Sequence, residues 1–107
     1  MDNSKIRVTI CPTSLKLLAD FWSLRIIESL QQGEQRYCEL QRGVGNVNPA
    51  TLTKKLADLE AANIVVRSEE IDGRSVHYKL SPLGLNAVPV LEAIKSFSQK
   101  YQKANKK

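Results

Sequence analysis

The sequence feature that most constrains the fold is a tight turn followed at once by a strong helix start. The glycine-rich run at 43–46 favours a turn. Asn48 can accept hydrogen bonds from unpaired helical N–H groups, and Pro49 suits the first helical position. Three leucines then recur on one helical face: Leu52, Leu56 and Leu59. The spacing predicts an amphipathic helix over 49–62, which Asn63 can end in a left-handed conformation.

Two further helices are expected before this turn. Apolar residues recur there at helical intervals: Leu15, Leu18, Trp22, Ile26 and Leu30. A break at 19–21 predicts a joint between the two helices, and Gly33 predicts the end of the second. Residues 35–37 then favour a short strand, and 38–43 favour a brief helix that carries Leu40 inward.

A β-hairpin and a last helix are expected after residue 63. Two β-favourable runs, 65–70 and 75–80, flank the segment 71–74, whose Asp72-Gly73 pair favours a hairpin turn. Ser81 and Pro82 open a final helical region, which Pro89 should kink or restart. Apolar residues keep helical spacing along it: Ala87, Val90, Leu91, Ile94, Phe97 and Tyr101.

This order of elements is that of a winged helix-turn-helix. The predicted fold class is mainly α with a small β-hairpin (α+β). The helices that end at Gly43 and begin at Asn48 form the helix-turn-helix pair, and the hairpin at Asp72-Gly73 forms the wing. A chain of 107 residues suits one domain, which we expect over 5–101, with 102–107 as a flexible Lys-rich tail.

Charge and cysteine content narrow the class of protein further. The formal net charge is +5, but four of those charges lie at the C-terminal end: Lys100, Lys103, Lys106 and Lys107. Nucleic-acid binding must therefore be argued from local patterning. Cys11 and Cys38 fit neither a disulfide framework nor a zinc motif, and no run is long enough to span a membrane. We expect reduced thiols, a cytoplasmic location and no membrane partner.

Catalysis finds little support in the sequence. His77 is the one histidine, and no second histidine or paired cysteines stand at metal-binding spacing, so we expect neither a metal nor another cofactor. A nucleophilic pair of His77 with Cys38 or Cys11 is formally available. No phosphate loop, Cys-x-x-Cys motif, acid pair or oxyanion-stabilising motif accompanies it. We expect that the chain is not an enzyme.

Six segments, in order along the chain, resemble the HxlR-type winged-helix transcriptional regulators of bacteria and archaea. The segment 36–40, Arg-Tyr-Cys-Glu-Leu, is similar to the family's Arg-Phe-x-Glu-Leu. The other matching segments are Cys11-Pro12, 22–27, 52–67, 78–84 and 88–91. Four positions depart from the family's usual residues: Ala19, Cys38, Asn63 and His77.

The predicted helix 49–62 carries a small, unobstructed outward face that suits the major groove. Lys54 can reach guanine acceptors or phosphate, Thr51 and Thr53 can donate and accept, and Ala50 can meet a thymine methyl group. Four further candidates could contact phosphates: Arg42, Asn48 at the helix N-terminus, Lys55, and Arg74 in the wing. A minor-groove contact is also open to Arg74, and a solvated charge in the turn is its alternative. A merely solvated helix face is the alternative.

The leading hypothesis is a homodimeric transcriptional regulator that binds double-stranded DNA at an inverted repeat. Its terminal helices would form the dimer interface. The alternatives are a winged helix used only for protein–protein interaction and a small redox enzyme. In some members of the resembled family, the matching N-terminal cysteine senses oxidants or electrophiles. That resemblance makes Cys11 a redox-sensing candidate, with Cys38 as its resolving partner, whereas two inert cysteines are the alternative.

Overall fold

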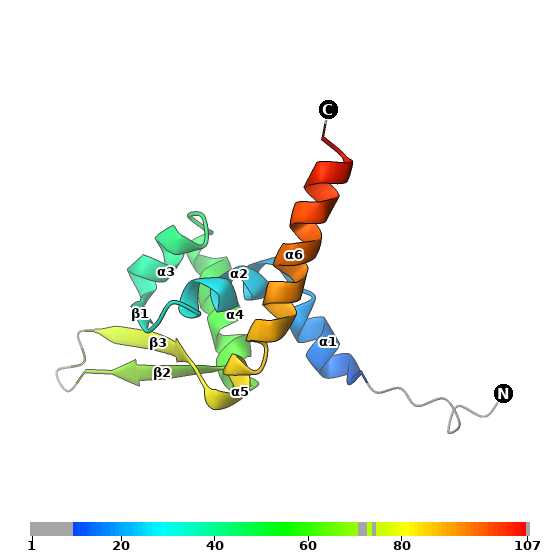
Figure 1. Ribbon diagram of the computed structural model, residues 1–107. Helices are drawn as coiled ribbons and strands as arrows, with labels where there is room; N and C mark the ends of the chain where they lie inside the picture. The colour runs from blue at the N-terminus through cyan, green and yellow to red at the C-terminus, as the bar shows by residue number, and fades with distance from the viewer. Residues whose placement is uncertain (1–9, 71–72, 74, 107) are drawn as a thin grey trace, which may run out of the picture.

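The computed structural model describes residues 10–70, 73 and 75–106. The elements follow one another in the predicted order (Figure 1): α1 (Pro12–Leu18), α2 (Phe21–Leu30), β1 (Gln35–Arg36), α3 (Tyr37–Gly43), α4 (Pro49–Ala61), β2 (Val65–Glu69), β3 (Val76–Leu80), α5 (Pro82–Leu85) and α6 (Val88–Ala104). The winged helix-turn-helix prediction is confirmed: α3 and α4 form the helix-turn-helix pair, and β2 and β3 form the hairpin.

The start and end of α4 follow from local side-chain chemistry. The Asn48 side chain accepts a hydrogen bond of 2.8 Å from the Ala50 N–H, and Pro49 occupies the first helical position. Beyond the helix, Asn63 has φ +64°, the left-handed region that asparagine tolerates better than most residues. The predicted caps at both ends of α4 are therefore present.

A small antiparallel sheet lies beside the helices, with strand order β1-β3-β2. The hairpin pairs Val65 with Leu80 at one end and Glu69 with Val76 at the other. Two residues of β1 extend the sheet on the other side of β3. Of the predicted hairpin turn, residues 71, 72 and 74 lie outside the described residues.

The strand β1 is shorter than predicted, because α3 begins one residue early. Tyr37 is the first residue of α3, although we expected it to end the strand. The Glu39 side chain accepts a hydrogen bond of 2.8 Å from the Arg36 N–H, which satisfies the backbone at the helix start. Cys38 consequently lies inside the first turn of α3 and not at its first residue, where we expected it.

The hydrophobic core lies between α2, α3, α4 and the sheet. The leucine stripe of α4 is buried, together with one face of α2 and the centre of α3. The most completely buried large side chains of the core are Ile26, Ile27, Leu40, Leu52, Leu56 and Leu59. This packing turns the opposite face of α4 toward solvent.

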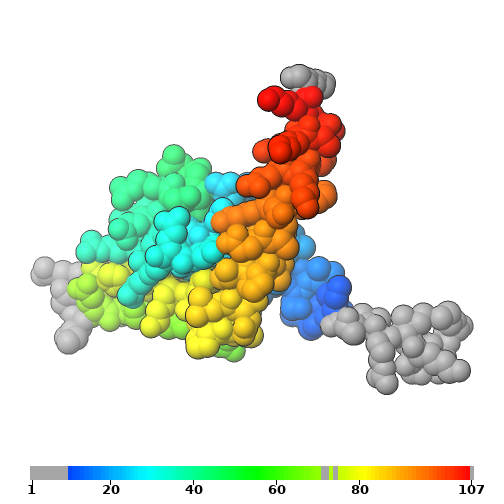
Figure 2. Space-filling model, viewed as in Figure 1, coloured from blue at the N-terminus to red at the C-terminus, as the bar shows by residue number. Residues whose placement is uncertain are grey.

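Helix α6 projects from the body of the domain (Figures 1 and 2). It starts afresh at Val88, with Pro89 in its first turn, and continues to Ala104, beyond the limit at Tyr101 that we expected. The Asn105 side chain donates a hydrogen bond of 2.9 Å to the Tyr101 carbonyl oxygen and so caps the extended end. Within α6, only Leu91 is buried.

The apolar residues of the last helical region divide between two environments. We expected the terminal helices to place these residues in the dimer interface, but Ala87 and Leu91 are buried in the domain's own core. Four others remain exposed along α6: Val90, Ile94, Phe97 and Tyr101. Among the described residues, no helix has the length and apolar character needed to cross a membrane.

Candidate nucleic-acid interface

The outward face of α4 forms a shallow, largely apolar surface with a few polar groups. We call it the reading face, and its residues are Pro49, Ala50, Thr53, Lys54, Ala57 and Asp58. Ala50 and Thr53 are exposed, whereas Thr51 is half-buried at the side. No bulky side chain of α4 itself obstructs this face, so a groove of nucleic acid can approach the helix closely.

Lys54 stands at the centre of the reading face with a highly exposed side chain. Its ammonium lies 3.2 Å from a carboxylate oxygen of Asp58, one helical turn further on, and the lysine side chain is 71% exposed. Such an exposed pair is worth little and breaks readily. Sequence reasoning missed Asp58, although its i, i+4 spacing from Lys54 was visible.

Lys55 faces in a different direction and holds α4 against the start of α2. Its Nζ lies 2.8 Å from Asp20 Oδ1, and both side chains are only about a quarter exposed (26% and 28%). Asp20 also caps α2, accepting a hydrogen bond of 2.8 Å from the Ser23 N–H. Burial raises the pKa of Asp20, but the hydrogen bonds from Lys55 and Ser23 outweigh it and leave that pKa below its ordinary value. The structure does not bring Lys55 to the reading face.

Two of the three remaining phosphate-contact candidates lie within the described residues. Arg42 is exposed in the last turn of α3, and Asn48 is exposed at the N-terminus of α4, where its side-chain oxygen caps the helix. Arg74 lies outside the described residues.

Tyr37 belongs to this region, although sequence reasoning assigned it no role. Its hydroxyl donates a hydrogen bond of 3.0 Å to the Pro49 carbonyl oxygen and lies 3.2 Å from Thr53 Oγ1. The available signal was the tyrosine at a position where the resembled family has phenylalanine. Only the folded chain shows that the hydroxyl reaches α4.

The two cysteines are both exposed but lie in different parts of the molecule. Cys11 is the N-cap of α1, and backbone N–H groups of Ser14 and Thr13 hold the pKa of its thiol below the ordinary value. Cys38 lies in α3, which Figure 1 shows on the opposite side of the domain from α1. A disulfide requires Cα atoms within about 7 Å, so this conformation does not join the two cysteines within one chain.

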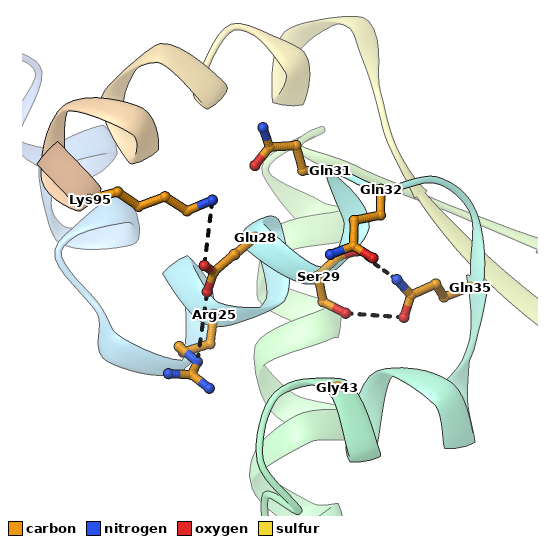
Figure 3. A pocket seen from close by; sticks show the side chains of 8 residues that line it. All are labelled: Arg25, Glu28, Ser29, Gln31, Gln32, Gln35, Gly43 and Lys95. Atoms are coloured by element: carbon orange, nitrogen blue, oxygen red, sulfur yellow. Dashed lines mark hydrogen bonds and ion pairs between the residues drawn. The ribbon is translucent and has the colours of Figure 1, made fainter.

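A polar pocket between α2 and α6 contains side chains that mainly bond one another (Figure 3). Glu28 lies between Arg25 and Lys95, at 3.9 and 3.5 Å, and the Ser29 hydroxyl donates a 3.0 Å hydrogen bond to Gln35. No buried side-chain nitrogen or oxygen in the described part of the chain lacks a partner. Within the same residues, no group of three or more His, Cys, Asp or Glu side chains is arranged to hold a metal ion.

Comparison with known proteins gives consistent matches. A family model described as HxlR-like helix-turn-helix matches residues 17–106. An HTH-type transcriptional regulator of Halalkalibacterium halodurans is 30% identical over 92 residues, which cover 83% of this chain and 80% of that protein. Another, from Methanothermobacter thermautotrophicus, is 27% identical over 75% of this chain, and the match spans only 62% of that protein.

Solved structures agree on the fold. A transcriptional regulator of the MarR family from Porphyromonas gingivalis superposes with a TM-score of 0.77 at 26% identity, covering 87% of this chain and 94% of that one. The redox regulator HypR in its reduced form gives a TM-score of 0.80 at 22% identity, covering 86% of this chain and 92% of that chain.

The Asp20–Lys55 pair should make a pH-dependent contribution to stability. Asp20→Asn keeps a side chain that can cap α2 but removes the charge, and we expect it to lower the free energy of unfolding at pH 7 by about 1 kcal/mol. Because folding lowers the pKa of Asp20, this contribution is present above the unfolded pKa of about 3.9 and disappears as pH falls through the folded value. Urea unfolding at pH 7 and at decreasing pH measures it.

The matched control is Asp58→Asn, which removes a carboxylate from the more exposed pair with Lys54 and should cost less at pH 7. A difference between wild type and Asp20→Asn that stays constant as the pH falls from 7 to well below the unfolded pKa of Asp20 would contradict the assignment.

Proposed function

Because the chain belongs to the HxlR-like helix-turn-helix family, we propose that it is a transcriptional regulator that binds double-stranded DNA with α4 in the major groove. The observation that carries this proposal is the reading face: small or polar side chains, with Lys54 extended from its centre. Lys54 would contact guanine acceptors or a phosphate, and Ala50 would contact a thymine methyl group. Thr53 would hydrogen-bond to a base edge, and Thr51 lies at the side of this face. We expect the protein in the cytoplasm.

Phosphate contacts would orient the protein on the duplex. Asn48 directly precedes Pro49 of the reading face, and Arg42 is exposed in the last turn of α3, so both suit this role. Arg74 is proposed from its place in the hairpin turn of the sequence. Lys55 is left out of the proposed contact set because its ammonium is engaged by Asp20.

We further propose that two copies of the chain bind an inverted repeat. The exposed apolar residues of α6 support this, since Phe97 is 66% and Tyr101 58% exposed in the single chain. Leu15 of α1 and Phe21 of α2 are also exposed, and an apolar groove between α2 and α6 continues the same surface. A two-fold dimer places its two recognition helices about 34 Å apart, one turn of DNA.

We also propose that the regulator responds to oxidants or electrophiles through Cys11. The lowered pKa of the exposed Cys11 thiol favours the thiolate, which is the form that oxidants and electrophiles attack. Cys38 would be the resolving thiol. Because α1 and α3 lie on opposite sides of one chain, such a bond would have to join two copies of the chain.

The DNA-binding proposal is tested with Lys54→Ala. A cognate duplex is first obtained by footprinting the DNA that flanks the coding region or by selection from randomised duplexes. If Lys54 reads guanine, the variant should lose about 1 to 3 kcal/mol on that duplex and relax preference at one base position. Titrations on cognate and random duplexes at several salt concentrations measure this.

Lys100→Ala is the charge-matched control, because Lys100 is exposed on α6 away from the reading face. An equal loss for Lys54→Ala on random DNA would assign Lys54 to phosphate. If wild type binds no duplex in a salt-dependent manner, the protein-interaction alternative replaces this proposal.

The dimer is tested with Phe97→Glu. A carboxylate in the centre of an apolar interface would be desolvated without a partner, so the variant should be a monomer at micromolar concentration while wild type is a dimer. Light scattering after size exclusion measures the mass. Lys103→Glu, at an exposed polar position on the same helix, should leave the dimer intact. A monomeric wild type at that concentration would contradict the proposal.

The redox proposal is tested by comparing wild type, Cys11→Ser and Cys38→Ser before and after diamide. Oxidation should change the DNA affinity of wild type about 5- to 150-fold, the usual range of coupling between sites, and leave Cys11→Ser unaffected. Non-reducing electrophoresis shows whether a bond joins two chains. If wild type keeps its affinity and both native thiols resist alkylation, the cysteines are structural.

A further inference from the structure

The hydroxyl of Tyr37 connects the first residue of α3 to the first two turns of α4. It lies 3.0 Å from the Pro49 carbonyl oxygen and 3.2 Å from Thr53 Oγ1. The tyrosine ring is half-buried and packs against the core, so the hydroxyl is held in place from the ring side. Thr53 is exposed on the reading face.

Elimination shows where the hydroxyl hydrogens of Tyr37 and Thr53 point. A carbonyl oxygen can only accept, so Tyr37 must donate its single hydroxyl hydrogen to Pro49. The tyrosine oxygen can then only accept from Thr53, so Thr53 must donate its own single hydrogen to Tyr37. The resulting relay runs from Thr53 through Tyr37 to the backbone of α4.

The relay leaves Thr53 with lone pairs but no hydrogen for an outside partner. In the major groove, adenine N6 and cytosine N4 are amino donors, whereas guanine O6 and N7 and thymine O4 are acceptors. A threonine that can only accept pairs with the first two. A threonine whose hydroxyl is free to rotate pairs with any of the four.

We propose that Tyr37 is a positioning residue that determines base specificity: by taking the hydroxyl hydrogen of Thr53, it makes α4 select adenine or cytosine on the strand that Thr53 faces. This inference rests on the proposed binding of α4 in the major groove. It assigns the reading of one base position to a side chain that lies outside the recognition helix.

The test compares base preference among four proteins: wild type, Tyr37→Phe, Thr53→Val and the double variant. Each selects binding sites from randomised duplexes, and the base position whose preference Thr53→Val loses is the one that Thr53 reads. Wild type should prefer adenine or cytosine there. Tyr37→Phe keeps the ring but frees the threonine hydroxyl, so this preference over guanine and thymine should fall about 3- to 10-fold.

Two controls separate this role from a structural one. In the Thr53→Val background, Tyr37→Phe should cause no further change at that base position, because no hydroxyl remains to orient. Thr53→Ser keeps a hydroxyl and should retain the wild-type preference. Thermal unfolding of each variant shows that it is folded.

Base analogues test directly whether Thr53 accepts a hydrogen bond from the amino group of the selected base. Replacing the selected adenine by purine, or the selected cytosine by 2-pyrimidinone, removes the amino group alone. Wild type should lose about 3- to 10-fold in affinity, and Thr53→Val should lose none.

Two results would overturn the inference while leaving the proposed function standing. One is a Tyr37→Phe variant with the wild-type base preference. The other is a uniform loss of affinity on all duplexes that persists in the Thr53→Val background, which would show that Tyr37 only stabilises the fold. A wild-type protein that selects no sequence at all would instead overturn the proposed function, and this inference with it.

Discussion

The burial of one leucine stripe on α4 controls the geometry of the whole candidate interface. Leu52, Leu56 and Leu59 are at most 2% exposed, and truncating a leucine in such a position costs about 2 to 5 kcal/mol. Because the stripe repeats once per helical turn, its burial sets the rotation of α4 about its own axis. Ala50, Lys54 and the other reading-face residues then point outward as a consequence. Core and interface are two faces of one helix, so the energy that folds the domain also presents the residues proposed to read DNA.

The buried stripe fixes the rotation of α4 about its axis but not the tilt of the helix or its side-chain rotamers. Polar contacts with neighbouring helices fix these. Lys55 ties the helix to the N-cap of α2 through Asp20, and Tyr37 ties its first two turns to α3. Partly exposed contacts of this kind add little net stability, since each replaces hydrogen bonds to water. Their contribution is geometric: they select one arrangement among several that bury the same leucines. A reading surface needs such selection, because base contacts depend on side-chain positions to within a fraction of an ångström.

Helix α6 differs from the other long helices because most of its apolar side chains are exposed. Its first turns attach to the core through Leu91, and its remaining length exposes aromatic and aliphatic side chains to solvent. In the proposed dimer, a second copy would cover this surface, and the spacing of the two reading faces would follow from how the α6 helices cross. The proposed signal at Cys11 lies at the start of α1, beside the exposed Leu15. A change in α1 would therefore act on the separation of the reading faces and not on the base contacts themselves.

The sequence by itself determined the order of elements, both caps of α4, its buried stripe and its outward face. These features depend on helical period, on Asn48, Pro49 and Asn63, and on turn chemistry, all of which act within a few residues of the chain. The boundary of α3 was one residue off because the Glu39 side chain accepts a hydrogen bond from the Arg36 N–H, which places the helix start at Tyr37. Only the tertiary structure decided which lysines form ion pairs and which hydroxyl groups contact each other. Lys55 pairs with Asp20, 35 positions away in the sequence, and Tyr37 contacts Thr53, 16 positions away. Both contacts form because α2 and α3 pack against α4. Likewise Ala87 and Leu91 share the apolar character and helical spacing of Val90 and Ile94, and only their position against the domain's own core separates buried from exposed.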